Sequence, residues 1–499
     1  MEKDSLYKLV KSLTPNEKGY FIKYGFKIKE NEKQKILIGL LDLLSKADVY
    51  EEQKIKESFA KKSRADFRII KFELFQRLVD SLTEFKKGKS TDSKVFGLLE
   101  QSQTLLNKGL YHQSRKLAEK AEKLSNEEDR FDLSIVAISH QKDTFHNNII
   151  SPEMLDELNE LRKKEESAAD KIRNISHYRS LFEQMRLVEF TTSSSDYSKD
   201  AQREELKKIL SSEYLQNPSK AIAHESKYLY HICYSIYYGT LKDHKNRLAN
   251  SRALLKLMEG NKNSKVESSS KYRNVINQFL NACLAAKDLT GFDEYLNLLE
   301  DGVNSITSPY MKARTFLIIK NQRLNKNFVN GEVEKNKEVI EQFKEELMMH
   351  EQMLPPEIFY ALYSNILITY FYCGDYRAAI PFINKIINEY NPKINKGVIS
   401  MAQCMNLIVH FELENYDLLH YLIKTSKAEK DTKYFELMGW LILLVETELN
   451  KKDKQKEKQL EKLFDQLKKL MKDESEKELM KDFYLDRWLS KRYKNFAAI

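Results

Sequence analysis

The residues that could do chemistry in this chain are scattered rather than clustered. The 499 residues include 10 His and 4 Cys, and no two Cys form a CxxC pair. His224 and His231 lie seven residues apart on a predicted helix, but no carboxylate stands at a third ligating position. The chain also lacks the HExxH and GxSxG motifs and the Gly-rich loops that bind phosphates. We therefore expect no enzymatic activity, no metal site and no cofactor.

A basic stripe is the one local pattern that suggests a charged ligand. It comprises Lys61, Lys62, Arg64, Arg68 and Lys71. The last three recur at spacings of four and three residues, so they share one face of a predicted helix and could contact phosphates or an acidic protein. Residues 1–90 carry 21 Lys and Arg against 14 Asp and Glu, which accounts for most of the net charge of +9. Acidic residues on the same helix favour the simpler interpretation, a mixed solvated surface.

Composition predicts that helices position these residues. Gly (14) and Pro (8) are rare, while hydrophobic residues make up 41% of the chain and charged residues 31%. Apolar residues at period 3.6 with few breakers are typical of an all-α protein. The longest apolar run, 437–445, is far shorter than the roughly 20 residues that span a bilayer. The scattered Cys and the lack of an apolar leader predict a cytoplasmic protein, and abundant Lys, Asn and Ile favour a bacterial source.

Residues 1–90 are expected to form a separate helical module. Five short helices are predicted, and the second begins with Thr14, Pro15 and Glu17 arranged as a capping box. Ser63 is expected to cap the fifth helix, whose apolar residues recur as far as Phe85. The stretch KKGKSTDSK at 86–94 then has linker character.

Between residues 95 and 473 the pattern changes to pairs of helices. Two pairs share a Gly, a Tyr two residues later, and small or apolar residues that follow at helical spacing. These residues are Gly109, Tyr111, Ser114, Ala118 and Ala121 in one pair, and Gly374, Tyr376, Ala379, Ile383 and Ile386 in the other. A weaker third pair turns at Asn415 and Tyr416, and other segments keep the two-helix rhythm alone, such as 168–190 with 200–211. The pattern resembles the tetratricopeptide repeat family.

The resemblance implies an α-solenoid of stacked helix pairs, a right-handed superhelix over 95–473, with a C-terminal capping helix at 474–499. In that family the first helix of each pair lines a concave face that binds peptides. The family's register assigns to this face Glu100, Gln103, Asn107, Ser364, Asn365, Phe371, Tyr372 and Glu412. Among these, Asn365 is expected to clamp a peptide backbone, because an amide side chain both donates and accepts hydrogen bonds.

Three functions are compatible with these patterns. The first is a non-enzymatic scaffold that binds a protein or peptide partner on the concave face. The second is a bacterial regulator, in which the array senses a peptide or protein and the basic N-terminal module contacts nucleic acid or a target protein. The third is an assembly factor bound to a large machine such as the ribosome or a polymerase. The sequence favours the first.

Overall fold

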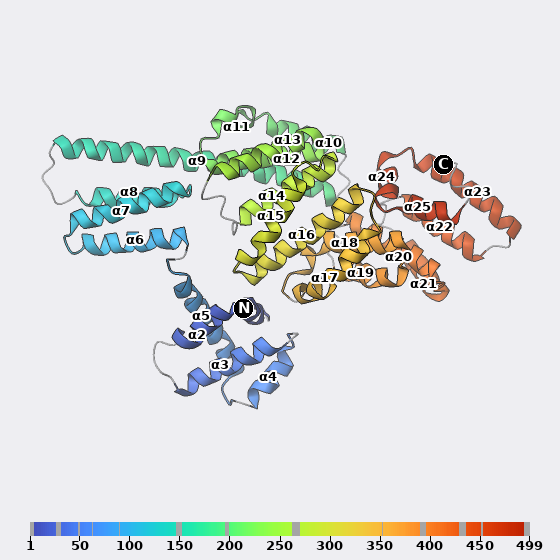
Figure 1. Ribbon diagram of the computed structural model, residues 1–499, viewed down its shortest axis with the longest axis horizontal. Helices are drawn as coiled ribbons and strands as arrows, with labels where there is room; N and C mark the ends of the chain where they lie inside the picture. The colour runs from blue at the N-terminus through green and yellow to red at the C-terminus, as the bar shows by residue number, and fades with distance from the viewer. Residues whose placement is uncertain are drawn as a thin grey trace. The chain divides into compact units, whose positions relative to one another are not determined.

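The computed structural model consists of helices and their connections. It describes residues 4–25, 31–47, 50–61, 63–88, 90–145, 152–194, 199–261, 270–351, 353–389, 396–428, 436–450 and 453–493. Over these ranges it has twenty-five α-helices, α1 to α25, and no β-strand (Figure 1). The prediction of an all-α protein is therefore confirmed. No helix within the same ranges has the length and apolar character needed to cross a membrane.

The chain divides into two compact units. The first comprises residues 1–189, 198–286 and 297–312, and the second comprises 190–197, 287–296 and 313–499. Helices α15 (Phe292–Gly302) and α16 (Pro309–Val329) each contribute residues to both. The site described below lies in the second unit.

The N-terminal module in the first unit contains the five predicted helices. They are α1 (Ser5–Ser12), α2 (Pro15–Tyr24), α3 (Asn31–Lys46), α4 (Glu52–Ala60) and α5 (Phe67–Lys86). They enclose their own hydrophobic core, in which Leu37, Leu74 and Leu78 are fully buried. The capping box of Thr14 and Glu17 is confirmed. The expected cap of α5 is wrong, because Asp66 rather than Ser63 accepts the hydrogen bonds of its first backbone N–H groups.

The next part of the first unit begins with the helix pair that contains Gly109. Its helices are α6 (Thr91–Leu106) and α7 (Tyr111–Glu127), followed by α8 (Phe131–Asp143) and α9 (Pro152–Ser194). Ser102 and Ser114 are fully buried and hydrogen-bonded to each other, so these small side chains let α6 and α7 approach closely. Helix α9 is a single helix of 43 residues that begins at Pro152, not near residue 168 as predicted (Figure 1).

The next five helices of the first unit follow α9 along the chain, and the first three of them share a hydrophobic core with its second half. They are α10 (Lys199–Leu210), α11 (Glu213–Gln216), α12 (His224–Thr240), α13 (His244–Gly260) and α14 (Ser270–Ala286). Tyr178 of α9 is fully buried here and donates a hydrogen bond to the backbone oxygen of Tyr214. The Tyr-rich helix α12 contributes to the same core.

The second unit continues the chain of helix pairs. After α16 come α17 (Lys335–Glu351), α18 (Tyr360–Cys373), α19 (Tyr376–Glu389), α20 (Lys396–Glu412), α21 (Tyr416–Ala428), α22 (Glu436–Asn450) and α23 (Asp453–Leu470). Helices α17 to α21 pack each against the next, and α18 and α22 also contact α20. The predicted C-terminal helix is instead two helices, α24 (Glu474–Asp482) and α25 (Leu485–Arg492), which are separated by Tyr484 at φ +54°.

The turns inside the helix pairs repeat one backbone conformation. From α12 to α21, a residue with positive φ ends the first helix of each pair. These residues are Lys242, Lys287, Gly331, Gly374 and Glu414, at steps of 45, 44, 43 and 40 residues, and Gly109 between α6 and α7 has the same conformation. At Gly374 the backbone N–H bonds to the carbonyl of Phe371 and the next N–H bonds to that of Tyr370. The same two bonds recur around Lys242, Gly331 and Glu414. This helix-ending motif favours Gly but does not require it.

Candidate functional site

The best candidate surface lies on α16, α18 and α20, the first helices of three successive pairs. Asn365 of α18 donates both of its amide hydrogens, one to Oδ1 of Asn321 and one to Oδ1 of Asn325, each over 2.8 Å. Both acceptors belong to α16. The three Asn side chains therefore form one polar cluster that joins the two helices.

Asn365 is consequently not the free clamp that the sequence predicted. Its two donors are used inside the cluster, whereas the Nδ2 groups of Asn321 and Asn325 make no hydrogen bond to any other described residue. Both of these side chains are half-buried, so their donors remain available to a ligand. Sequence reasoning missed them because the turn at Gly331 has Val333 where the family pattern has Tyr.

Two other residues predicted for this surface serve the fold instead. The Ser364 hydroxyl donates to the backbone oxygen of Tyr360 over 2.8 Å, within its own helix. Phe371 is only 3% exposed, and its ring packs edge-on against Tyr376 across the turn. The prediction that Phe371 faces a ligand is therefore wrong: an aromatic residue three positions before the turn packs between the two helices of its pair.

Tyr372 does lie on the surface of α18, and it contacts α25. The Arg487 guanidinium stacks on its ring at 3.7 Å from the centroid and donates a hydrogen bond to its hydroxyl. The Tyr484 ring packs edge-on against the same residue at 4.8 Å and also stacks on Phe328 of α16 at 6.2 Å. Arg487 reaches Glu334 as well, with 3.4 Å between Nη2 and Oε1.

Glu412 at the end of α20 makes the second set of contacts with α25. Its Oε1 accepts hydrogen bonds from Trp488 Nε1 and Arg492 Nη1, each over 2.9 Å. The Arg492 guanidinium also lies 4.3 Å from the ring centre of Phe411. The carboxylate is therefore matched by one charged and one neutral donor from the same short helix.

We call this surface the α16–α18–α20 face. It is defined by Asn321, Asn325, Phe328, Asn365, Tyr372, Phe411 and Glu412. It combines aromatic rings, a carboxylate and free amide donors, and one end of it is covered by α25. Of the predicted residues, the structure brings Asn365, Tyr372 and Glu412 together here.

The other predicted binding residues, Glu100, Gln103 and Asn107, form a separate group on α6 in the first unit. Gln103 Nε2 donates to Asn107 Oδ1 over 3.0 Å, and both Glu100 and Asn107 are exposed. These residues present an ordinary solvated helix surface, and no aromatic or charged partner for it occurs among the described residues.

The basic stripe of the N-terminal module is not continuous. Lys71 is 8% exposed, and its ammonium group donates to Tyr50 Oη over 2.7 Å and to Glu52 over 2.9 Å. Burial by itself would lower the pKa of Lys71, but these two hydrogen bonds outweigh it and raise the pKa. Lys71 is therefore a core residue and cannot contact a partner together with Arg68.

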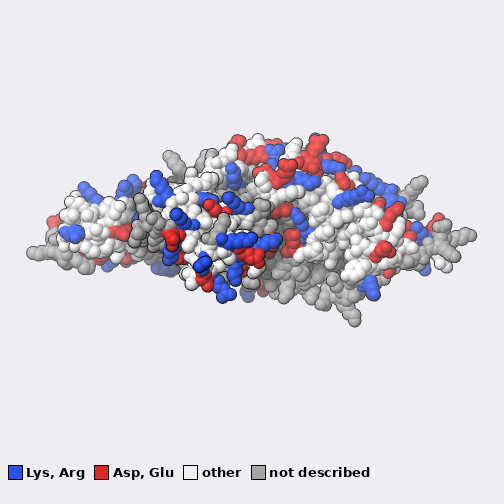
Figure 2. Space-filling model, turned by 90° about the horizontal axis from the view of Figure 1, so that it is seen from below, with Lys and Arg blue, Asp and Glu red and all other residues white. Residues whose placement is uncertain are grey.

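The rest of the stripe remains at the surface. Lys61, Arg64 and Arg68 are exposed, and Lys62 lies outside the described residues. Figure 2 shows basic and acidic side chains interleaved over the described part of one side of the molecule. This distribution gives no specific support for a phosphate-binding surface.

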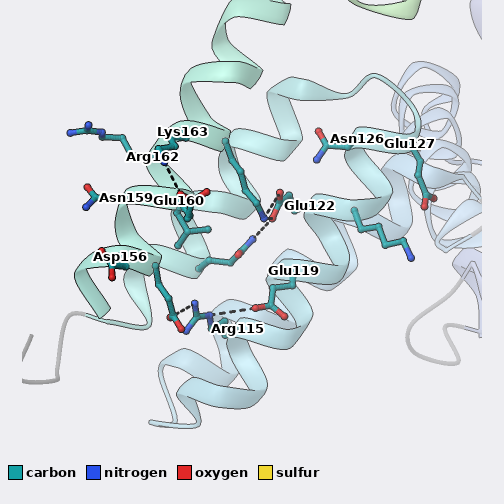
Figure 3. Close-up of a pocket in the computed structure, with 15 residues that line it drawn as sticks. Arg115, Glu119, Glu122, Asn126, Glu127, Asp156, Asn159, Glu160, Arg162 and Lys163 are labelled. Atoms are coloured by element: carbon teal, nitrogen blue, oxygen red, sulfur yellow. Dashed lines mark hydrogen bonds and ion pairs between the residues drawn. The ribbon is translucent and has the colours of Figure 1, made fainter. Parts of the chain in front are cut away.

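A large polar cleft of about 1240 Å³ lies between α7, α8 and the first half of α9 (Figure 3). Arg115 bonds to Glu157 over 2.7 Å and also approaches Glu119. The buried Glu122 accepts hydrogen bonds from Gln141 and Lys164. Acidic and basic side chains thus neutralise one another in the cleft, and none of its lining residues is Ser, Thr, Cys, His or Tyr.

His224, His231 and Cys233 on α12 occupy structural positions. His231 Nδ1 lies 2.8 Å from Asn250 Oδ1, and burial lowers its pKa. His224 lies 3.3 Å from the backbone oxygen of Leu257. Burial raises the pKa of the Cys233 thiol to about 12, which makes it a poor nucleophile. No group of three potential metal ligands occurs in the part of the chain that the structure describes.

Comparison with known proteins gives no relative for this chain. No protein-family model matches it, and no match was found among curated proteins or solved structures.

Proposed function

We propose that the protein is a non-enzymatic helical-repeat scaffold that binds a segment of a partner protein on the α16–α18–α20 face. The observation that carries this proposal is the position of α25, which contacts the face through Arg487, Trp488 and Arg492, together with Tyr484 just before the helix. A surface that accommodates one helix by stacking and charged hydrogen bonds has the chemistry needed to bind another. The recurrence of the left-handed turn every 40–45 residues supports an array of stacked pairs, similar to tetratricopeptide repeats.

The side chains of the face favour a protein ligand over a nucleic acid. Glu412 of the face, and Glu334 just before α17, supply negative charge, which would repel phosphates and attract Lys or Arg. The pKa of Glu334 is lowered, first by its own backbone N–H and then by Tyr372 and Arg487, so this carboxyl is ionised at neutral pH. Asn321 and Asn325 offer amide donors that suit the carbonyl groups of a peptide.

The proposal is tested by selecting peptides that bind the immobilised full-length chain and measuring their affinity for variants. We expect Asn325→Ala and Glu412→Gln each to weaken a selected ligand at least about tenfold. The first removes an amide from the face, and the second removes the charge that strengthens the hydrogen bonds of its carboxylate. Glu100→Gln is the matched control, since it removes a carboxylate from an exposed position on α6. Ligands whose affinity is unchanged by both face variants, while circular dichroism shows that the variants are folded, would refute the assignment of the face.

A further inference from the structure

We propose that α25 is an internal competitor for the partner, and that the partner contributes a helix with the same arrangement of side chains. That arrangement is an Arg, an adjacent aromatic residue and a second Arg five positions after the first, as in Arg487, Trp488 and Arg492. The inference rests on the proposed function of the α16–α18–α20 face and adds both the chemistry of the partner and a condition for its binding.

The contacts of α25 define what the face selects. Arg487 reaches α18 through Tyr372, whereas Trp488 and Arg492 reach the end of α20 through Glu412. Two guanidinium groups therefore stack on aromatic rings and meet carboxylates at two separate points. A segment with Lys in place of Arg would lose the planar stacking, because an ammonium group lacks the flat surface of a guanidinium.

The fit of α25 leaves room for a better ligand. The Arg487 Nε group is buried without any hydrogen-bond partner, and the 3.4 Å contact with the largely exposed Glu334 is long. The helix has only eight residues, so it depends on the packing of its buried residues Leu485, Trp488 and Leu489. A longer partner helix could satisfy the unpaired group and continue along the face to Asn321 and Asn325.

The neighbouring helix α24 shows where a release of α25 would begin. Buried Glu476 of α24 accepts hydrogen bonds from the backbone N–H groups of Glu436 and Leu437, so it anchors α24 to the start of α22. Tyr484, at φ +54°, separates this anchored helix from α25. Tyr493 beyond α25 bonds to Glu448 of α22, and this is a contact that a partner must also overcome.

The test uses a fluorescent synthetic peptide with the sequence of residues 484–493, YLDRWLSKRY, titrated into the full-length chain. In the wild-type chain the tethered α25 competes with the peptide at high effective concentration. Arg487→Ala weakens that competitor, so we expect it to bind the peptide at least tenfold more tightly than the wild type. Lys491→Ala is the control, because Lys491 is exposed on the same helix, and it should bind like the wild type. Adding Glu412→Gln to Arg487→Ala should abolish the gain.

Several results would overturn the inference. No peptide binding by a folded Arg487→Ala chain, or equal binding by wild type and variant, would show that α25 is a fixed part of the fold. If Arg487→Ala fails to fold, Arg487→Lys is used in its place, because it keeps the charge but loses the stacking. It too should bind the peptide more tightly than the wild type does. Formation of dimers by the variant in sedimentation would instead indicate exchange of α25 between two copies.

Peptide affinity combined with hydrogen exchange of the α25 amides separates this inference from the proposed function. A selected peptide that loses affinity in Asn325→Ala but leaves hydrogen exchange in α25 unchanged would support the face as a binding surface and refute α25 as its competitor. If neither the wild type nor Arg487→Ala binds any ligand whose affinity depends on the residues of the face, both the proposed function and this inference are refuted.

Discussion

The contact between Tyr372 and Arg487 should hold α25 in place, and a double-mutant cycle can measure its strength. The two residues are 115 positions apart in the chain. Replacing either with Ala removes the stacking and the hydrogen bond, and replacing both shows whether the two losses share one cause. We expect the double variant to be little less stable locally than either single variant.

The magnitude follows from the geometry of the contact. A guanidinium stacked on a Tyr ring and partly exposed contributes about 1 kcal/mol, and a hydrogen bond from a charged donor contributes about 1.5 kcal/mol. The ion pair with Glu334 adds at most about 0.5 kcal/mol, because the Arg487 and Glu334 side chains are 38% and 60% exposed. Allowing for incomplete additivity, we expect a coupling free energy of about 2 kcal/mol between Tyr372 and Arg487, or about a 30-fold change in the opening equilibrium.

Native-state hydrogen exchange of the α25 amides measures this opening directly, without requiring two-state unfolding of the whole chain. Each single variant should exchange about 30-fold faster in α25 and at an unchanged rate in α7. Lys491→Ala should leave both rates unchanged. A coupling free energy below about 0.5 kcal/mol, or equal acceleration in α7, would refute the view that this contact specifically holds α25.

Three further predictions concern other parts of the fold. Lys71→Met should destabilise the N-terminal module by about 1–3 kcal/mol, because it removes the hydrogen bonds from Lys71 to Tyr50 and Glu52. Arg68→Ala is the control and should change the stability of the N-terminal module by less than about 0.5 kcal/mol. Hydrogen exchange of the α5 amides measures the difference, and equal exchange rates in the two variants would contradict the buried role of Lys71. Gly374→Ala should cost about 1 kcal/mol, because φ is +75° there. Gly439→Ala, at an exposed position in the first turn of α22, should be neutral or stabilising by up to about 1 kcal/mol. Thermal unfolding of both variants checks this, and a Gly374→Ala chain more stable than the wild type would contradict it. Burial lowers the pKa of His231 and His410 below the ordinary value of 6.5, so the unfolded chain binds more protons in this range. The contribution of the two neutral histidines to stability should be complete above pH 6.5 and should decline as the pH falls through their lowered pKa values. His231→Gln should therefore make the melting temperature depend less on pH. An unchanged pH dependence in this variant would contradict the prediction.

The helices themselves could be predicted well because their signals are local. The Thr14 capping box and the Gly374 turn depend only on residues within a few positions, and both occur as expected. The turns at Lys242, Lys287 and Glu414 lack the Gly, although Tyr416 still marked the last of them. Packing of the helix pairs there imposes the left-handed conformation on residues that disfavour it by about 1–2 kcal/mol.

The candidate site could be predicted only in part because it depends on distant contacts. The family register assigned Asn365, Tyr372 and Glu412 to one surface, but it could not show that Asn321 and Asn325 use the donors of Asn365. It also gave no indication that Arg487 and Arg492 return to α18 and α20. Lys71 fitted a surface stripe by spacing, yet Tyr50 and Glu52 from outside its own helix provide partners that allow its burial.

The most direct test of the central claim is hydrogen exchange of the full-length Arg487→Ala chain with and without saturating 484–493 peptide. If the α16–α18–α20 face binds a protein segment, the peptide should slow exchange at the C-terminal ends of α16, α18 and α20 and should leave α6 to α9 unchanged. Slower exchange confined to the cleft between α7 and α9, or no change on the face despite measured binding, would contradict the claim.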